Sequence, residues 1–494
     1  MRELPEKPFM YQLFIDGKYV DSISGKKFTR MSPAHNVIIG EYALAGKEDA
    51  ELAIKAARKA FNNESWKMMP GAARAKIINR VAALIRENSE ELAFIETLES
   101  GKPISQAIDE MEWAAGIWDY AATLCRHQHG DVINTLGKDM FAAMFRQPIG
   151  VVGMITPWNF PLLIISQKLP FALAAGCTAV VKPSELTPGT TLRLGGMLKE
   201  AGIPDGVVNI LAGYGDPVGK TMSESMDVDM ISFTGSTFVG KQIVAASQHN
   251  LKKVSLELGG KNPQIIFPDA DMDAVIDSVV FGVYFNMGEC CNSGSRIIVH
   301  KDIADEFVDK VLEHAKKVKV GDPLDPTVKV GAIINDQQLD KILKYIKSGK
   351  DQGACLKMGG DLINTEVGKY VKPTVFCDVR PDMEIAKEEI FGPVLSVIKF
   401  ENTEEAVSIA NSTIYGLSAS VWTKDIDTAM IMSRSIEAGT VWVNNFMSGY
   451  PEVSFGGFKQ SGLGRELGRF SVEEFSELKS VLIHIGTPGG KWIN

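Results

Sequence analysis

Residues 151–185 read VVGMITPWNFPLLIISQKLPFALAAGCTAVVKPSE, and this stretch decides the fold. Its apolar run at 151–155 predicts a buried strand, residues 162–175 have helical spacing, and 178–181 predict a second strand. Strands that alternate with helices are typical of a parallel sheet with helices on both faces. The stretch therefore predicts an α/β protein with a doubly wound sheet.

The same alternation continues as far as residue 258. Polar residues and glycines follow each predicted strand, and ligands of such sheets bind at the carboxyl ends of the strands. We therefore expect a nucleotide site at this edge. The further strand-like runs are Val207–Leu211, Val228–Phe233 and Val254–Leu256, and the helical stretches are Thr190–Ala201, about Pro217–Ser223, and Phe238–His249. The residues at the strand ends are 156–161, 182–185, Gly213, Gly215, 234–237 and 257–260.

The rest of the chain predicts a helical start, a second α/β domain and two unassigned strands. Helical spacing is found in Ala50–Phe61 and Ala73–Phe94, after a short strand-like FIDGKYV. The pieces at about 130–148 and 478–486 read as strands of neither half and are candidates for pairing with another subunit. The second half contains strand-like runs at 264–267, 297–299, 394–400, 419–422 and 440–443, with helical stretches at 303–318 and 403–411.

Composition indicates a soluble globular protein of more than one domain. The 494 residues are 45% apolar and 23% charged, and the net charge of −9 argues against nucleic acid or an anionic membrane as partner. We find no run of about 18 apolar residues and no signal-like start. Six cysteines without a Cys-x-x-Cys pair argue against zinc or any other metal, and we expect reduced thiols and a cytoplasmic location.

Residues 235–241, GSTFVGK, fit two kinds of phosphate site. They match the start of a P-loop, but Gln242 stands where the magnesium-binding Ser or Thr belongs. They equally fit a dinucleotide site, in which Gly235 allows a tight turn and a helix N-terminus faces the pyrophosphate. The plain alternative is a helix start capped by Ser236.

Lys182 and Glu185 follow the second strand, where an adenosine ribose would lie. A carboxylate there accepts hydrogen bonds from ribose hydroxyls and repels a 2′-phosphate, which favours NAD over NADP. The competing interpretation is a local ion pair on a solvated loop.

Cys291 and Glu257 are the candidates for chemistry. Cys291 lies in a loop between Gly288 and Gly294, next to Cys290, where a partly exposed thiol can act as a nucleophile. Glu257 ends an apolar strand, where burial would raise its pKa toward that of a general base. The plain alternatives are a small buried cysteine and a carboxylate that caps a turn.

Taken together, these segments resemble the aldehyde dehydrogenase superfamily, in the same order over nearly the whole chain. The resemblance is carried by Pro157–Phe160, Lys182–Glu185, Phe233–Thr237, Leu256–Pro263, the Cys291 segment, Glu388–Pro393 and Phe455–Lys459. It implies a doubly wound cofactor domain (1–128 and 150–258), an α/β catalytic domain (259–465) and a small β oligomerisation element (129–149 and 466–494). It also implies a homodimer or homotetramer.

The resemblance assigns roles to these residues. Cys291 is expected to be the nucleophile with Cys290 an inert neighbour, Glu257 the general base, and Asn159 the side-chain donor of the oxyanion hole. The reaction implied is oxidation of an aldehyde to a carboxylic acid through a thioester on Cys291. The expected NAD contacts are Thr156, Trp158, Lys182, Glu185, Gly235, Ser236, Glu389 and Phe391.

Two positions depart from the family pattern. Glu289 stands where many members have Gln, and a carboxylate facing Cys291 would raise the thiol pKa, so we expect it to point away. Gln167 replaces a Trp common in betaine-aldehyde and aminoaldehyde enzymes, which weakens a quaternary-ammonium substrate. A hydrophobic aliphatic, terpenoid or aromatic aldehyde is therefore expected. The predicted pocket residues are Phe160, Leu163, Gln167, Phe285, Tyr450 and Phe455, with Ile164 beside them.

Four alternatives remain at this point. A P-loop hydrolase is disfavoured by Gln242, and an inactive homologue by the presence of Cys291, Glu257 and Asn159. An enzyme that passes the thioester to coenzyme A is disfavoured by Glu257, which suits hydrolysis. A betaine or aminoaldehyde dehydrogenase of the same family is the fourth.

Overall fold

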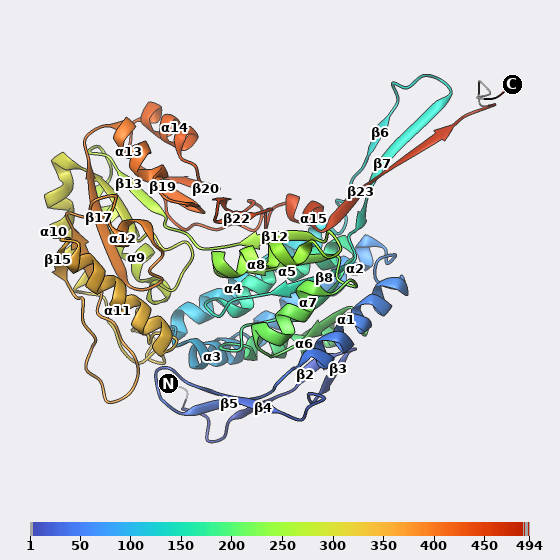
Figure 1. Ribbon diagram of the computed structural model, residues 1–494, viewed down its shortest axis with the longest axis horizontal. Coiled ribbons are helices and arrows are strands. Elements are labelled where there is room, and N and C mark those ends of the chain that lie inside the picture. Colours follow the sequence, from blue (N-terminus) through green and yellow to red (C-terminus); the bar gives the residue numbers. More distant parts are fainter. Residues whose placement is uncertain (1–2, 488, 490–492, 494) are drawn as a thin grey trace.

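The cofactor-side sheet is the doubly wound sheet that the sequence predicts. The computed structural model describes residues 3–487, 489 and 493, and Figure 1 shows its two α/β lobes side by side. The chain passes from β8 through β9 to β10, then returns to the other side of β8 for β11 and β12, with these five strands parallel. The strand order is β22 (Gly462–Leu463), β12 (Lys253–Glu257), β11 (Met230–Thr234), β8 (Val151–Ile155), β9 (Thr178–Lys182), β10 (Val208–Ile210), β2 (Leu13–Ile15) and β3 (Lys18–Val20).

The order of these strands reverses between β8 and β11. Ligands of open α/β sheets bind at such a switch point, outside the carboxyl ends of the strands. Those ends carry Thr156, directly after β8, and Thr234, the last residue of β11. The topology therefore places the expected nucleotide site here.

Helices cover both faces of this sheet. The helix α5 is apolar almost all round because it is buried between the sheet and other helices. The stretch 73–94, predicted as continuous, is broken at Asn88, whose backbone N–H and side-chain amide both donate to the carbonyl of Leu84. The helices are α1 (Lys47–Asn62), α2 (Gly71–Glu87), α3 (Ser89–Ser100), α4 (Ile104–Leu124), α5 (Pro161–Ala175), α6 (Gly189–Ala201), α7 (Lys220–Glu224), α8 (Thr237–Ser247) and α15 (Phe470–Glu474), and the π-helical turn η1 is Gly215–Gly219.

The second lobe is built on its own mostly parallel sheet and its own core. The strand order is β15 (Cys355–Met358), β16 (Thr374–Cys377), β17 (Val394–Phe400), β14 (Arg296–His300), β13 (Pro263–Ile266), β19 (Ser418–Trp422) and β20 (Thr440–Val443). Its helices are α9 (Met272–Tyr284), α10 (Ala304–Ala315), α11 (Asp336–Asp351), α12 (Glu384–Lys387), α13 (Thr403–Asn411) and α14 (Ile426–Ser435), with short 3₁₀ turns η2 (Phe285–Gly288) and η3 (Lys301–Ile303). The predicted α/β fold class with two sheets is confirmed.

The remaining strands form small sheets at the margins. The unassigned pieces near 130–148 and 478–486 pair with each other, as β6 (Asp131–Ile133), β7 (Met140–Pro148) and β23 (Ser476–His484). They project from the body as a long antiparallel arm (Figure 1). The other small sheets are β1 (Phe9–Tyr11), β5 (Ile38–Ala43) and β4 (Lys27–Met31), and β18 (Tyr415–Gly416) with β21 (Phe458–Lys459).

The expected domain boundaries stay predictions, and their outermost residues, 1–2, 488, 490–492 and 494, lie outside the described residues. Among the helices of the described ranges, none is long and apolar enough to cross a membrane. The same residues contain no group of three or more His, Cys, Asp or Glu side chains that could hold a metal ion.

Candidate active site

Cys291 lies in a loop between α9 and β14 that begins with a left-handed turn. Asn286, Met287 and Gly288 have φ values of 48°, 59° and 73°, so the chain reverses hand before it reaches the two cysteines. Cys290 is buried and Cys291 is partly exposed, as a nucleophile requires. All six cysteines are free thiols.

The loop after β12 packs directly on the Cys291 backbone. The side-chain amide of Asn262 donates to the carbonyl of Cys291 at 2.7 Å and to that of Ser293 at 3.0 Å. A Cβ on Gly260 would stand 2.6 Å from the Cys291 carbonyl oxygen, so a side chain there would displace the loop. The segment that begins with Glu257 therefore fixes the position of the Cys291 loop.

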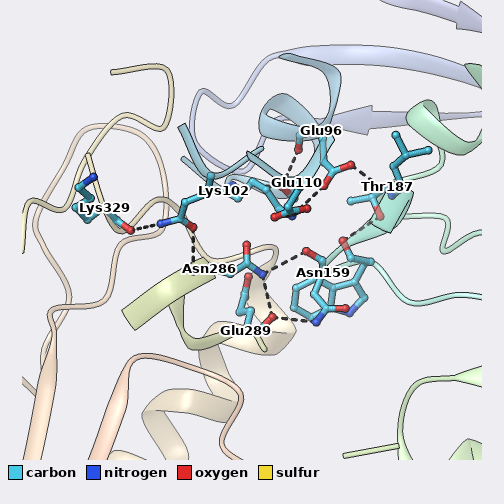
Figure 2. Close-up of polar contacts among 12 residues, drawn as sticks. Glu96, Lys102, Glu110, Asn159, Thr187, Asn286, Glu289 and Lys329 are labelled. Carbon is cyan, nitrogen blue, oxygen red and sulfur yellow. Dashed lines mark hydrogen bonds and ion pairs between the residues drawn. The ribbon is translucent and has the colours of Figure 1, made fainter. Parts of the chain in front are cut away.

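Asn159 is buried and faces the same loop from the cofactor side. Its Nδ2 donates one hydrogen to the carbonyl of Glu289 at 3.0 Å, which orients the amide and leaves the second hydrogen for another acceptor (Figure 2). This contact places the Asn159 amide against the backbone two residues before Cys291, where an amide N–H can serve as an oxyanion-hole donor.

Glu257 ends β12 with only 4% of its surface exposed. Within the described residues neither of its carboxylate oxygens has a hydrogen-bond partner. Burial raises its pKa well above the usual range, the Glu466 carboxylate raises it further, and Lys168 lowers it. The Cys291 thiol is also close enough to raise this pKa. A buried carboxyl with free oxygens and a raised pKa is suited to accept a proton from water.

The surroundings of Cys291 raise the pKa of its thiol. A hydrogen bond with the Cys290 thiol, burial and the Glu389 carboxylate together raise its pKa well above the usual range. Glu289 does not face this thiol, because its Oε1 accepts a hydrogen bond from the backbone N–H of Ile334 at 3.2 Å. The expectation that Glu289 points away is confirmed.

The adenosine end of the predicted NAD site contains a partly formed ion pair. The ammonium of Lys182 donates to the carbonyls of Pro183 and Gly213 at 2.9 and 2.8 Å, and lies 3.7 Å from the carboxylate of Glu185. The Lys182 side chain is 4% exposed and that of Glu185 is 33% exposed. Glu185 therefore remains accessible, and its local ion pair with Lys182 leaves room for the predicted ribose contact.

The pyrophosphate end is the N-terminus of α8. Ser236 caps this helix, because its side chain accepts a hydrogen bond from the N–H of Val239 at 3.3 Å. The interpretation of this serine as a helix cap is therefore also correct. A Cβ on Gly235 would lie 2.5 Å from the ring of Phe233, which explains the glycine. In the described part of the chain, Thr156 Oγ1 and Thr234 Oγ1 are buried without a hydrogen-bond partner. Two unsatisfied hydroxyls at the sheet's switch point fit a polar ligand such as NAD.

The nicotinamide end combines Glu389, Phe391 and Trp158. Glu389 lies against the backbone after β12 and accepts from the N–H of Gly260 at 3.1 Å. Phe391 has a left-handed backbone with φ of 59°, and its ring meets that of Trp158 edge-on, with centroids 5.4 Å apart. Strain of this kind is commonly retained at functional sites.

The predicted substrate pocket is aromatic around Phe160 and less defined elsewhere. The rings of Phe160 and Phe285 stack with centroids 5.9 Å apart. The ring of Phe281 has its centroid 5.1 Å from that of Phe285, and the sequence did not indicate this residue. Leu163 is buried and Gln167 half-buried on α5. Tyr450 is 60% exposed, whereas Phe455 packs against the same hydrophobic cluster as Phe160 and Phe285.

Several polar residues near the site were not predicted. Lys168 forms a buried ion pair with Glu466, and this pair lies next to Glu257. The signal for Lys168 was present, because it is the one charged residue of the apolar helix α5. Glu96, Lys102 and Glu110 form a second buried cluster (Figure 2). The ammonium of Lys102 lies 4.5 Å from the centroid of the Phe160 ring.

Comparison with known proteins agrees with this geometry. Residues 19–481 match the sequence model of the aldehyde dehydrogenase family. Aldehyde dehydrogenase 1A1 of Gallus gallus is 46% identical, covering 96% of this chain and 93% of that protein. Betaine aldehyde dehydrogenase of Bacillus subtilis (strain 168) is 40% identical, covering 98% of this chain and 99% of that protein.

Solved structures give the same result. The crystal structure of an NAD-dependent aldehyde dehydrogenase from Sinorhizobium meliloti has a TM-score of 0.97 and 47% identity, covering 99% of this chain and 97% of that one. An indole-3-acetaldehyde dehydrogenase in complex with NAD has a TM-score of 0.96 and 42% identity, covering 97% of this chain and 98% of that one.

Proposed function

The chain belongs to the aldehyde dehydrogenase family and is an NAD-dependent aldehyde dehydrogenase, and we propose that it oxidises hydrophobic aldehydes through a thioester on Cys291. The observation that carries the proposal is the arrangement around Cys291. Its backbone is held by Asn262, Asn159 offers a free amide hydrogen beside it, and Glu257 has free carboxylate oxygens near its thiol.

The first half of the reaction needs a nucleophile and a donor for developing charge. The Cys291 thiol passes its proton to a water molecule and its sulfur adds to the aldehyde carbon, whose C=O electron pair moves onto oxygen to give a tetrahedral alkoxide. Asn159 Nδ2–H and the Cys291 backbone N–H donate to that oxygen. Loss of hydride from the alkoxide then leaves a thioester on Cys291. NAD, when bound, supplies the hydride acceptor.

The second half needs a base. Glu257 takes a proton from water, whose oxygen attacks the thioester carbon, and the C–S bond breaks to release the acid and the Cys291 sulfur. Burial without a partner suits Glu257 to this step, because a raised pKa makes its carboxylate a stronger base. Because Glu257 is suited to activate water, we expect the acyl group of the thioester to be hydrolysed and not transferred to coenzyme A.

NAD would be held along the switch point of the sheet. Glu185 and Lys182 are proposed for the adenosine ribose, the N-terminus of α8 with Ser236 for the pyrophosphate, and Glu389 with Phe391 for the nicotinamide ribose and ring. Thr156, Trp158 and Gly235 line the path between them. The unsatisfied hydroxyls of Thr156 and Thr234 support this placement.

The proposed substrate class rests on the apolar wall of Phe160, Phe285 and Phe281. Stacked rings favour an apolar or aromatic side chain, and similarity to an indole-3-acetaldehyde dehydrogenase supports an aromatic aldehyde. A betaine or aminoaldehyde is the second candidate, favoured by the 40% identity to the Bacillus subtilis betaine aldehyde dehydrogenase. Gln167 in place of an aromatic ring argues against it.

The test is NADH formation with NAD and a panel of aliphatic, terpenoid, aromatic and betaine aldehydes. Wild-type protein is expected to act best on an apolar class and to yield the free acid with or without coenzyme A. Cys291→Ser is expected to abolish NADH formation. The matched control is Cys355→Ser, which replaces another free cysteine, on β15. Undiminished activity of Cys291→Ser would refute the proposed nucleophile. Highest activity on the betaine aldehyde would contradict the proposed apolar substrate class and support the second candidate.

We also propose that the arm of β6, β7 and β23 joins subunits into a dimer or tetramer in the cytoplasm. Its support is apolar surface on the projecting strands, such as Phe141 and Leu482, which are 40% and 63% exposed. Light scattering of wild type and Leu482→Asp tests this. A monomeric wild-type protein would contradict it.

A further inference from the structure

The turn before the nucleophile is strained and must be held in place. Asn286 and Met287 are non-glycine residues with left-handed backbone, followed by Gly288 with φ of 73°. Each such residue costs roughly 1–2 kcal/mol relative to ordinary backbone. Consecutive left-handed residues persist only where their surroundings enforce them, so the contacts of this turn are informative about its purpose.

The backbone of the turn is held from helix α4. The N–H of Asn286 donates to Oε1 of Gln106 at 3.0 Å, and Nε2 of Gln106 donates to the carbonyl of Lys329 at 2.9 Å. Figure 2 labels Lys329 and Asn286, the two residues whose backbones this one side-chain amide joins. Gln106 therefore fixes the start of the turn from a different lobe of the protein.

The side chain of Asn286 reaches the oxyanion donor. It is 1% exposed, and its Nδ2 donates to the carbonyl of Asn159 at 3.2 Å and to that of Glu289 at 2.9 Å. The amide orientation is fixed, because the reverse would place Oδ1 against two carbonyl oxygens. The Glu289 carbonyl also accepts from Asn159 Nδ2, so one acceptor is shared by both asparagines.

We propose that Asn286 is a positioning residue for aldehyde oxidation, an inference that rests on the proposed roles of Cys291 and Asn159. Its amide ties the backbone of Asn159 to the backbone two residues before Cys291. It thereby sets the distance between the two groups that hold the alkoxide, the Asn159 side chain and the Cys291 N–H. Asn286 acts through these groups and touches no reacting atom.

The competing explanation is that Asn stands here only because it tolerates left-handed backbone. Asn286→Gly and Asn286→Ala separate the two. Glycine accepts the left-handed turn at no steric cost but lacks the amide, whereas alanine lacks both. If backbone conformation is all that matters, the glycine variant keeps full activity. If the amide positions the site, both variants lose activity.

The matched control is Asn36→Ala. Asn36 also has left-handed backbone, with φ of 55°, but its side chain is exposed in a turn near the N-terminal strands. This variant carries the same backbone cost and is expected to leave activity unchanged. Gln106→Leu is the second probe, since it releases the turn without altering any residue of the catalytic loop.

The experiment measures kcat, the KM for NAD, NAD affinity by fluorescence titration, and the rate at which iodoacetamide alkylates Cys291. Asn286→Gly is expected to lower kcat by about 10- to 100-fold, the range that displacement of a reacting group by about 1 Å produces. NAD affinity is expected to stay unchanged. Gln106→Leu is also expected to lower kcat. The rate at which Cys291 is alkylated is expected to change in both Asn286→Gly and Gln106→Leu.

Full kcat in Asn286→Gly, or a loss explained entirely by weaker NAD binding, overturns the inference. If the Asn286 variants do not fold, Gln106→Leu decides, and wild-type kcat and alkylation rate in that variant overturn it. Failure of the proposed function is distinguishable, because Cys291→Ser would then keep its activity.

Discussion

Replacing Lys102 by Met is expected to destabilise the protein, and to do so more strongly as pH rises. Lys102 is fully buried, and its ammonium contacts Glu96 at 2.9 Å and Glu110 at 2.6 Å. Burial raises the pKa of Glu110 well above its usual range and the neighbouring Glu96 raises it further, whereas Lys102 lowers it. Two carboxyl groups this close to each other and to one ammonium balance its charge with a single negative charge shared between them. Methionine keeps the length of the side chain next to Phe160 but removes the balancing charge.

The size of the effect follows from the proton that the variant must take up. Without Lys102 the remaining buried carboxylate is neutralised by protonation, which costs about 1.4 kcal/mol for each pH unit above its solution pKa of about 4.3. The cost is about 4.4 kcal/mol at about pH 7.5 and about 1.6 kcal/mol at about pH 5.5. The larger value agrees with the roughly 3–5 kcal/mol that breaking a buried pair costs.

The sign follows from proton binding. A folded-state pKa raised above the unfolded value gives stability that is present at low pH and is lost as pH rises. Wild-type protein does not take up this additional proton when it folds. The difference in the free energy of unfolding between wild type and Lys102→Met is therefore smallest at low pH. Unfolding entropy of about 2.1 cal/mol/K per residue makes 1 kcal/mol equal to about 1 °C for 494 residues.

Thermal unfolding across this pH range is the assay. The melting temperature of Lys102→Met is expected to lie about 4 °C below wild type at about pH 7.5 and under about 2 °C below it at about pH 5.5. The control is Glu96→Gln/Lys102→Met, which removes both charges and is expected to lose the additional pH dependence. A difference in melting temperature between Lys102→Met and wild type that does not change with pH would refute the charge argument. It would leave lost packing as the cause.

Three further predictions concern the site. Asn159→Ala removes one oxyanion donor and is expected to lower kcat by about 10²–10³, with little change in NAD affinity by titration. Glu185→Gln removes the charge that repels a 2′-phosphate, so the ratio of kcat/KM with NADP to that with NAD is expected to rise, and an unchanged ratio would contradict the ribose contact. Glu257 acts deprotonated, so its raised pKa shifts the acid limb of the pH–rate profile upward. Glu466→Gln removes a charge that raises it and is expected to move that limb to lower pH, whereas an unmoved limb would exclude the coupling.

Much of the cofactor-side fold could be predicted because buried parallel strands leave a plain signal. The run 151–155 is β8 without change, and 178–181 is extended by Lys182 alone. Such strands are apolar on both faces, so their limits coincide with the first polar residue. The helical spacing over 73–94 corresponds to two helices, α2 and α3, separated at Asn88, whose side chain bonds back to the carbonyl of Leu84.

The candidate site was predictable where its residues stand at strand ends, and not where they depend on pairing. Glu257 and Lys182 are the last residues of their strands, so topology alone brings them to one edge. Lys168 and Glu466 are 298 residues apart in sequence, and no local pattern connects them. The direction of the Glu289 side chain depends likewise on Ile334, which belongs to a distant loop.

The connection between the two sheets is itself part of the site. Strand β12 ends at Glu257 and β13 begins at Pro263, so the intervening residues carry the chain from one lobe to the other. Within them Gly260 donates to Glu389 and Asn262 to the carbonyl of Cys291. These bonds tie the residues that follow Glu257 to Glu389 and to the Cys291 loop. Because Asn286 ties the opposite side of the nucleophile loop to Asn159, Cys291 is held from both lobes, which explains how a strained turn is kept in one conformation.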